Sequence, residues 1–484
     1  MFQEKDISYL QSLGISQEEV YNQIDLLKKN NSFLKIHAAA TPDKGIKQIQ
    51  DKDKYLDLFD KNSKKYKIGK FVPASGAATR MFKRLISFAQ NPNEQTLNDG
   101  NSFSVKESFD NIDRFAFFET LKTCKNYSKE PNKLADAILN SCLGYGGIPK
   151  GLIEFHKYDE GSRTAFEEHL HEAKTLSSKD IDIHLTVSPE FMEDFKNKLN
   201  EINNKKGFNL NVNFSIQEKS TDTIALNEDK TPVKNTDGNL LLRPGGHGAL
   251  IQNLNKINSD IVFIKNIDNL THGDYLEETT TYKKLLGGVL IEKIEKIKEI
   301  YLELSENPTE SAIHNAIEYL QKEFNTDFTK SSDKIKSIID FINRPIRVCG
   351  MVQNTGEPGG GPYWVNKEGE ISLQIVEKAQ IDLSKPDQEK HLKEATHFNP
   401  VDLVCYLKSP VGSKFDLNRF IDKDACFVSE KTHMGNNIRV LEHPGLWNGA
   451  MSDWLTIFVE VPLITFNPVK ELNDLLRQMH QPKG

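Results

Sequence analysis

Residues 71–85, FVPASGAATRMFKRL, have the composition of an anion-binding loop. An apolar run leads into a helical pattern through the small residues Ala74, Ser75, Gly76 and Ala77. Main-chain N–H groups of such a loop approach anions closely, and the dipole of the following helix favours negative charge there. Arg80 and Lys83 would supply the positive charge that a triphosphate requires. The alternative is a small-residue turn that serves only packing, and the spacing matches neither a P-loop nor the dinucleotide fingerprint.

A second candidate is Lys150, which follows Gly-Gly-Ile-Pro and precedes the apolar run Leu-Ile-Glu-Phe. Glycine and proline in this order predict a turn that holds the lysine at the mouth of a strand. A lysine ammonium is a compact point charge that suits a phosphoryl oxygen. The alternative is a solvated lysine in a proline-containing turn.

Three glycines surround His247 in LLRPGGHGALIQNL, residues 241–254, and a helical pattern follows. Glycines at this density allow a main chain to pass close to a base or a sugar. His247 lacks the partners of a zinc ligand. We expect it either to hydrogen-bond to a substrate or to be an ordinary loop histidine.

The strongly apolar run DIVFIKN, residues 260–266, predicts a buried strand that ends in Asn266, Asp268 and Asn269. Ligands of open α/β sheets bind at the carboxyl ends of strands. Mg²⁺ prefers one or two carboxylates together with phosphate oxygens. Asp268 is therefore the candidate metal ligand, and the alternative is that these residues only end the strand and begin a turn.

Two later segments carry polar side chains that suit a substrate. The glycine-rich stretch at 349–365 combines Glu357 with Tyr363 and Trp364. Carboxylates and aromatic rings suit the hydroxyls and the faces of a sugar, although the stretch is equally compatible with a hairpin loop. Lys470 follows Pro468 at a predicted strand-to-helix turn, where its local sequence does not distinguish it from a surface lysine.

Short apolar runs between these segments predict the strands of one sheet. The runs are FVPA (71–74), DIHLTVS (182–188), NVNFSIQ (211–217), DIVFIKN (260–266), IRVCGMV, ISLQIVE, DLVCYL and LTIFVEV. Helical stretches alternate with them, a pattern typical of an α/β fold with a mostly parallel sheet and crossover helices.

The chain is predicted to have two regions. Residues 1–65 form a helical N-terminal segment in which Val20, Ile24 and Leu27 recur at helical spacing. Residues 66–484 form the catalytic region, with charged helical insertions near 84–145 and 274–343.

The bulk composition excludes several classes of partner. A net charge of -7 and a pI near 6.1 argue against salt-driven binding of nucleic acid. No apolar run approaches the roughly 18 residues that span a bilayer, and the start of the chain lacks the pattern of a signal peptide. We therefore expect a cytoplasmic protein with neither a nucleic-acid nor a membrane partner.

The cysteines are odd in number and widely spaced: Cys124, Cys142, Cys349, Cys405 and Cys426. They form no C-x-x-C pair and have no clustered histidine partners. We expect reduced, mostly structural thiols, without a zinc site or a disulfide framework.

Taken in order, these segments resemble the UDP-glucose and UDP-N-acetylhexosamine pyrophosphorylases of the nucleotidyltransferase clan, and over the whole chain a bacterial family carried as a domain of unknown function. Residues 71–83 look like the nucleotide-binding loop of the clan, and Pro149-Lys150 looks like its Pro-Lys element. Further segments that carry the resemblance are Phe214–Gln217, Pro244–Gly248, Asn266–Asn269, residues 372–381, residues 398–404 and the late element around Lys470.

The resemblance implies a GT-A-type nucleotidyltransferase core, a Rossmann-like mixed sheet flanked by helices. It implies an enzyme that makes a nucleotide sugar and pyrophosphate from a nucleoside triphosphate, UTP by the same resemblance, and a sugar 1-phosphate. Arg80, Lys150 and Lys470 would then be catalytic, and Asp268 would hold Mg²⁺.

The same resemblance assigns the remaining substrate contacts. Gln217 and Gly246 would contact the base. The sugar pocket would consist of His247, Asn354, Glu357, Glu377 and Asn399.

Two alternatives to this function and one question about the site stay open. A GT-A-type glycosyltransferase would consume a nucleotide sugar, and a non-catalytic nucleotide-sugar-binding protein would only hold one. Lys150 lies much farther from the small-residue loop in sequence than the corresponding lysine of the clan. Either residues 84–145 are an insertion, or Lys83 has taken over the role of that lysine.

Overall fold

The structure, a computed structural model, describes residues 2–29, 33–125, 127–177, 181–208, 210–357 and 359–484. It divides into two compact units. Unit 1 comprises Met1–Lys52, Gln217–Ile261 and Leu286–Val461, and unit 2 comprises Asp53–Ile216, Val262–Leu285 and Pro462–Gly484. The predicted boundary at residue 65 falls inside the first segment of unit 2.

The sheet strands of unit 2 follow the order β10-β3-β6-β7. Their bounds are Ile261–Lys265, Ile68–Pro73, Asp182–Thr186 and Asn211–Ser215. β3 is parallel to β6, and β6 is parallel to β7. All of β10 is buried, which is typical of strands with both faces covered. A separate antiparallel hairpin pairs β4 (Glu154–Tyr158) with β5 (Gly161–Thr164).

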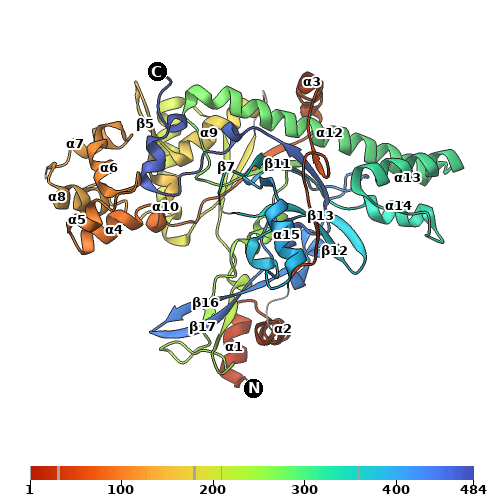
Figure 1. Cartoon of the computed structure of the whole chain (residues 1–484), viewed down its shortest axis with the longest axis horizontal. Helices are drawn as coiled ribbons and strands as arrows, with labels where there is room; N and C mark the ends of the chain where they lie inside the picture. Colours follow the sequence, from red (N-terminus) through yellow and green to blue (C-terminus); the bar gives the residue numbers. More distant parts are fainter. Residues whose placement is uncertain (1, 30–32, 126, 178–180, 209, 358) are drawn as a thin grey trace. The chain divides into compact units, whose positions relative to one another are not determined.

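The predicted insertion at 84–145 is helical, as its sequence indicates, and its short helices form one group in Figure 1. They are α4 (Lys83–Gln90), α5 (Glu94–Leu97), α6 (Val105–Asp110), α7 (Phe118–Lys122) and α8 (Pro131–Asp136). The longer helices of unit 2 are α3 (Lys52–Asn62), α9 (Ala165–Leu176) and α10 (Met192–Lys206).

The prediction that all cysteines are reduced is wrong for one pair in this insertion. Cys124 and Cys142 form a disulfide, with their Cα atoms 6.1 Å apart. The two residues are 18 positions apart in sequence, and only the folding of the insertion brings them together. Cys349, Cys405 and Cys426 are free and buried, as expected of structural thiols.

Unit 1 contains three sheets. In the first, the order is β2 (Ile46–Lys47), β18 (Leu455–Glu460), β11 (Ile346–Gln353) and β15 (Asp402–Tyr406), with β14 (His397–Phe398) also paired to β11. β2, β18 and β11 are parallel, and β15 is antiparallel to β11. The second is β1 (Ile36–Ala39), β12 (Gly361–Lys367) and β13 (Glu370–Val376), and the third is β16 (Phe427–His433), β17 (Asn436–Glu442), β8 (Thr223–Asn227) and β9 (Leu242–Arg243).

These strands confirm the predicted mixed, mostly parallel α/β fold and revise two details. All eight predicted strands are present, but ISLQIVE forms β13 of the antiparallel three-stranded sheet. The prediction that residues 1–65 are helical throughout is wrong at β1 and β2, because these short strands pair with β12 and β18 from the distant C-terminal half.

The helices of unit 1 are α1 (Glu4–Ser12), α2 (Gln17–Lys28), α11 (Ile251–Asn255), α13 (Glu310–Phe324), α14 (Lys334–Ile342) and α15 (Pro386–Glu394). The long helix α12 (Leu276–Glu306) begins within the residues of unit 2, and α12 to α14 confirm the helical prediction for 274–343. In the part of the chain that the structure describes, no helix combines the length and apolar character of a membrane span.

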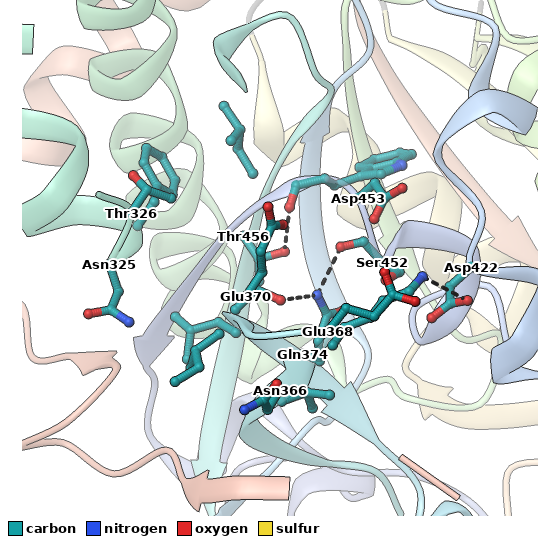
Figure 2. A pocket seen from close by; sticks show the side chains of 18 of the residues that line it. Asn325, Thr326, Asn366, Glu368, Glu370, Gln374, Asp422, Ser452, Asp453 and Thr456 are labelled. Atoms are coloured by element: carbon teal, nitrogen blue, oxygen red, sulfur yellow. Dashed lines mark hydrogen bonds and ion pairs between the residues drawn. The ribbon is translucent and has the colours of Figure 1, made fainter. Parts of the chain in front are cut away.

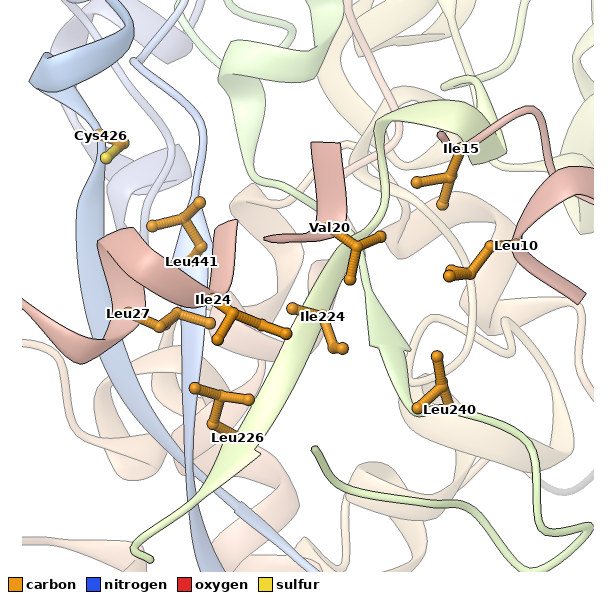
Figure 3. Packing of buried hydrophobic residues seen from close by; sticks show 10 residues of the cluster. All are labelled: Leu10, Ile15, Val20, Ile24, Leu27, Ile224, Leu226, Leu240, Cys426 and Leu441. Atoms are coloured by element: carbon orange, nitrogen blue, oxygen red, sulfur yellow. The ribbon is translucent and has the colours of Figure 1, made fainter. Parts of the chain in front are cut away.

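The N-terminal helices pack on the third sheet of unit 1 (Figure 3). The Ser16 side chain caps α2 by accepting from the Glu19 main-chain N–H at 3.1 Å. Val20, Ile24 and Leu27 are buried against residues of β8 and β17, such as Ile224, Leu226 and Leu441. The predicted helical spacing in this segment therefore marks the face that joins the core.

Candidate functional site

Asp268 lies just beyond the carboxyl end of β10 in unit 2, and two lysines contact its carboxylate. Lys150 Nζ donates to Oδ2 at 2.8 Å, and Lys470 Nζ lies 3.1 Å from Oδ2 and 3.3 Å from Oδ1. Asp268 and Lys150 are buried, whereas the Lys470 side chain is 49% exposed. The fold thus brings together three predicted site residues that are 118 and 202 positions apart in sequence.

The charges of this cluster stabilise one another. Burial favours the neutral acid, but the Lys470 and Lys150 ammonium groups outweigh it and hold the pKa of Asp268 below its ordinary value. Burial lowers the pKa of Lys150, and the Asp268 carboxylate acts in the opposite direction. Lys150 Nζ also donates to the Val469 carbonyl at 2.6 Å. Lys150 is therefore fixed by two buried acceptors, and Lys470 is the cation that can turn toward a ligand.

The late segment reaches Asp268 because its main chain pairs with the end of β10. The Val469 N–H donates to the Asp268 carbonyl at 3.0 Å, and the Asn467 N–H donates to Asn269 Oδ1 at 2.8 Å. Asp474 Oδ2 accepts from the N–H groups of Lys470 and Glu471, both at 2.7 Å. These bonds fix the main chain that carries Lys470.

Lys150 also lies beside the small-residue loop, despite the helical insertion between them in sequence. Its N–H donates to the Gly76 carbonyl at 3.4 Å, and Ala77 pairs with Pro149 in an isolated bridge. Lys83 is exposed on α4. Lys150 therefore contacts the small-residue loop although residues 84–145 lie between them in sequence.

The loop ends β3 and leaves room beside it. Ala74 is buried and its N–H donates to the Thr186 carbonyl, while Ser75, Gly76 and Ala77 are exposed. A Cβ added at Gly76 would meet no atom within 4 Å. The protein therefore leaves space around the main chain of this loop.

A pocket of about 930 Å³ in unit 2 carries an excess of cationic side chains. Arg80, Lys83, Arg84 and Lys470 line it together with Asp99 and Glu471. Arg84 is paired with Asp99 and, at 2.9 Å, with Glu471. Within the described ranges, neither Arg80 nor Lys83 has a carboxylate at ion-pair distance. Such a pocket attracts an anion.

The donor set around Asp268 limits how it could bind a metal. Among the residues that the structure describes, no group of three or more His, Cys, Asp or Glu side chains is arranged to hold a metal ion. Asp268 supplies one carboxylate, and both of its oxygens accept from lysines. Since Mg²⁺ commonly takes its other ligands from phosphates and water, one carboxylate is chemically compatible with such an ion.

His247, in unit 1, is held as a neutral ring. Its Nδ1 accepts from the Leu446 N–H at 3.1 Å, so the ring proton lies on Nε2. The ring stacks on Trp447 with centroids 4.4 Å apart, and burial lowers the pKa of His247 to about 4. His247 can therefore donate one hydrogen bond from Nε2.

Two of the three glycines around His247 serve packing within unit 1. A Cβ at Gly245 would lie 2.3 Å from the His443 ring, and one at Gly248 would lie 2.2 Å from the Pro444 carbonyl oxygen. Gly246 has φ of +77°, a conformation that favours glycine. The clustering of glycines in this sequence thus reflects close contact with the loop that carries His443 and Pro444.

Gln217, the predicted base contact, is also in unit 1, and its side-chain amide donates to Thr221 Oγ1 at 3.4 Å.

The predicted sugar-side residues fall into two groups in unit 1. Glu377 and Asn399 both lie against Gly360. A Cβ added at Gly360 would lie 3.0 Å from Glu377 Oε1, and the Gly360 carbonyl accepts a hydrogen bond from the Asn399 N–H at 2.8 Å. Burial raises the pKa of Glu377. Asn354 and Glu357 belong to the preceding loop, of which Pro358 lies outside the described residues.

Asn448 is a polar residue of this region that sequence reasoning missed. It is buried, its Nδ2 donates to the Ile375 carbonyl at 3.0 Å, and its side chain interacts with Glu377. A Cβ at Gly445 would lie 2.6 Å from Asn448 Oδ1 and 2.7 Å from His247 Cε1. The signal for it was the Gly-, Pro- and Trp-containing stretch HPGLWNG at 443–449.

Unit 1 also contains a pocket of about 920 Å³ with acidic walls (Figure 2). Glu368, Glu370, Asp422 and Asp453 line it, and Asp422 pairs with Lys367 at 3.0 Å. Of the described residues that form its walls, none is a predicted site residue. Its negative charge is unfavourable for a phosphate-bearing ligand.

Comparison with known proteins identifies a family and a fold. A family model described as Domain of unknown function (DUF4301) matches residues 3–481. A search of curated proteins finds no match.

The uridine diphosphate N-acetylglucosamine pyrophosphorylase from Trypanosoma brucei, solved in complex with inhibitor, aligns with a TM-score of 0.52 and 12% identity over 98% of this chain and 79% of that one. A UDP-glucose pyrophosphorylase mutant from Leishmania major, in complex with UDP-glucose, aligns with a TM-score of 0.45 and 13% identity over 97% and 77%. The first of these similarities confirms the predicted nucleotidyltransferase-type fold.

Proposed function

Because the chain belongs to the family Domain of unknown function (DUF4301) and has the fold of a UDP-sugar pyrophosphorylase, we propose that it is a nucleotidyltransferase. It would form a nucleotide sugar and pyrophosphate from a nucleoside triphosphate, UTP in the first instance, and a sugar 1-phosphate. The observation that carries the proposal is the Asp268 carboxylate held between Lys150 and Lys470 at the end of β10. The cationic pocket of the same unit supports it.

In the proposed reaction, an oxygen of the sugar phosphate attacks the α-phosphorus in line, and the bond to the bridging oxygen of the leaving pyrophosphate breaks. Such transfers depend on positioning and on the stabilisation of charge. Arg80 and Lys83 lack carboxylate partners in the described part of unit 2 and would hold the outer phosphates. Lys150 and Lys470 would stabilise charge at the α-phosphate and the sugar phosphate.

Asp268 would hold Mg²⁺, which when bound would offset the negative charge of the nucleotide phosphates. Lys470 would leave the carboxylate as substrate binds and donate to a phosphate oxygen. Its exposed side chain supports this movement, whereas buried Lys150 would remain on Asp268.

Roles in substrate recognition are also proposed for residues of unit 1. Gln217 and Gly246 are proposed to contact the base. His247 has a proton on Nε2 that suits a substrate oxygen, and Glu377 and Asn399 would bind sugar hydroxyls. Asn354 and Glu357 remain candidates for the same pocket.

The test is a screen of sugar 1-phosphates against the four nucleoside triphosphates with Mg²⁺, with pyrophosphate release as the readout. We expect at least one pair of substrates to turn over. Removal of a charged group that acts in the transition state costs about 100- to 1,000-fold in turnover, and we expect losses of this size for Lys470→Ala and Asp268→Asn.

Lys205→Ala is the matched control, because Lys205 is an exposed lysine of unit 2 that pairs with Glu201. It should retain wild-type turnover. Nucleotide binding without turnover across the whole screen would favour a binding protein, and consumption of a nucleotide sugar would favour a glycosyltransferase. Turnover of both site variants within tenfold of wild type would refute the assigned roles.

A further inference from the structure

Unit 2 contains a buried chain of three titratable side chains that the proposed reaction does not use. His156 is on β4, Glu168 is on α9, and His480 ends a short 3-10 turn at Gln478–His480. Their exposed fractions are 0%, 2% and 1%. His156 Nδ1 lies 2.9 Å from Glu168 Oε1, and His156 Nε2 lies 2.9 Å from His480 Nδ1. The three groups therefore form one continuous hydrogen-bonded line.

A main-chain group fixes the direction of the protons at one end of this line. The Gly273 N–H donates to the Tyr158 hydroxyl oxygen at 2.8 Å. The hydroxyl proton of Tyr158 then points to Glu168 Oε1, 2.5 Å away. Arg163 Nη1 lies 3.7 Å from the other carboxylate oxygen of Glu168. Burial raises the pKa of Glu168, whereas the Tyr158 hydroxyl and Arg163 favour its carboxylate, and in this form Oε1 accepts both hydrogen bonds.

The ring protons of His156 and His480 can be assigned in turn, starting from Glu168. Because Glu168 Oε1 accepts, His156 Nδ1 must carry a proton and donate it. Burial lowers the pKa of both His156 and His480 well below the ordinary value, so each ring is neutral and carries one proton. His156 Nε2 is then bare and accepts from His480 Nδ1. Both rings are protonated at Nδ1.

His480 is connected through short contacts to the segment that carries Lys470. The His480 N–H donates to the Arg477 carbonyl at 3.0 Å, and Arg477 Nη2 pairs with Asp474 Oδ1 at 2.8 Å. The other oxygen of Asp474 accepts from the Lys470 N–H at 2.7 Å. The neighbouring Met479 carbonyl accepts from the His272 N–H at 2.7 Å. The hydrogen-bonded line therefore anchors the turn that holds Lys470.

We propose that Glu168, His156 and His480 act as a one-directional hydrogen-bond relay, and that His480 is a positioning residue for Lys470. The donor at His480 Nδ1 is the feature that matters, rather than the volume of the ring. This inference rests on the proposed function in one respect only, which is that Lys470 acts in turnover.

Two variants with similar side chains separate the donor from the volume. In His480→Asn, an amide N–H occupies nearly the position of Nδ1 and keeps the bond to His156. In His480→Gln, the amide lies nearer the position of Nε2 and that bond is lost. Near-ultraviolet circular dichroism of both variants checks that they fold.

The first readout does not require turnover. The rate at which an acylating reagent labels Lys470, measured by peptide mass spectrometry, reports whether the ammonium is held at Asp268. We expect His480→Gln to raise this rate by about fivefold, the equivalent of one lost hydrogen bond, and His480→Asn to leave it within about twofold. Equal rates in the two variants would overturn the proposal, since only the volume of His480 would then matter.

The second readout is nitrogen NMR of the wild-type chain labelled at histidine, with signals assigned through single variants of His156 and His480. We expect both rings to be neutral and protonated at Nδ1. A proton on Nε2 of either ring, or a doubly protonated ring, would overturn the relay. If no substrate pair is turned over, the proposed function fails while these two measurements still decide the relay.

Discussion

Lys150 and Lys470 bind the same carboxylate, yet their replacement should affect stability very differently. Lys150 is buried, and its loss leaves the buried Asp268 carboxylate and the Val469 carbonyl without their closest donor. Removing one partner of a buried pair costs about 3–5 kcal/mol. The Lys470 side chain is 49% exposed, and exposed pairs contribute about 1 kcal/mol or less.

We therefore expect Lys150→Ala to lower the thermal midpoint of unit 2 by roughly 10 °C and Lys470→Ala to lower it by roughly 3 °C or less. Both variants should lose turnover. Differential scanning calorimetry measures the midpoints, and pyrophosphate release with the substrates found by the screen measures turnover. Equal shifts in the two variants, or a larger shift for Lys470→Ala, would refute the reasoning that Lys150 is the structural partner.

Three further outcomes are expected. The pKa of His247 is about 4 in the folded chain and about 6.5 in the unfolded chain, so the free energy of unfolding should fall by about 3 kcal/mol as the pH drops through this window. In urea unfolding at pH 7 and pH 4, His247→Gln should lose less stability between the two pH values than the wild type. An equal loss in both proteins would contradict the assignment. Chelation of Mg²⁺ with EDTA should abolish pyrophosphate release and added Mg²⁺ should restore it, whereas activity that persists in EDTA would exclude the metal. Leu27→Ala should destabilise unit 1 by about 2–5 kcal/mol in urea unfolding, because Leu27 is fully buried, while exposed Lys28→Ala should change little.

The strands and the position of Asp268 were predictable because their signals are local, whereas Lys150 and Lys470 were expected beside it only through the resemblance. Each strand is an apolar run of its own, and a polar group at the end of such a run lies at an edge of the sheet whatever the connections are. Asp268 could therefore be found from residues 260–269 alone. The contact of Lys150 with the loop at Gly76 was implied only by resemblance, since the helical insertion separates the two in sequence.

The features that sequence reasoning missed depend on partners far along the chain. β1 and β2 are too short to show a pattern, and they exist because β12 and β18 supply their hydrogen bonds. The glycines around His247 suggested an approach to a ligand, but Gly245 and Gly248 are small because His443 and Pro444 lie against them. Local sequence does not reveal whether a glycine makes room for a ligand or for another loop of the protein.

A buried ionic cluster shows how unit 2 holds its strands in register with its helices. Glu172 on α9 lies 2.8 Å from Lys70 Nζ on β3 and 2.6 Å from Lys265 Nζ on β10, and Lys283 of α12 lies 3.8 Å away. Burial lowers the pKa of Lys70 to about 8, even though Glu172 favours its charged form. Burying such charges gains little stability over an apolar core, but each charge must meet its partner, so the cluster favours one arrangement of the strands.

Helix α9 therefore connects several of the segments that lead to Asp268 and Lys470. Glu172 fixes β3, which leads into the small-residue loop, and β10, which leads to Asp268. His169, one turn earlier, contacts the Ile267 carbonyl through Nε2 at 3.1 Å, directly before Asp268 in the chain. Glu168 begins the relay to His480 and the segment of Lys470. Glu172 and His169 contact β3 and the β10 segment directly, and Glu168 reaches the segment of Lys470 through His156 and His480. A shift of α9 would therefore displace these segments together, and the geometry around Asp268 depends on this helix.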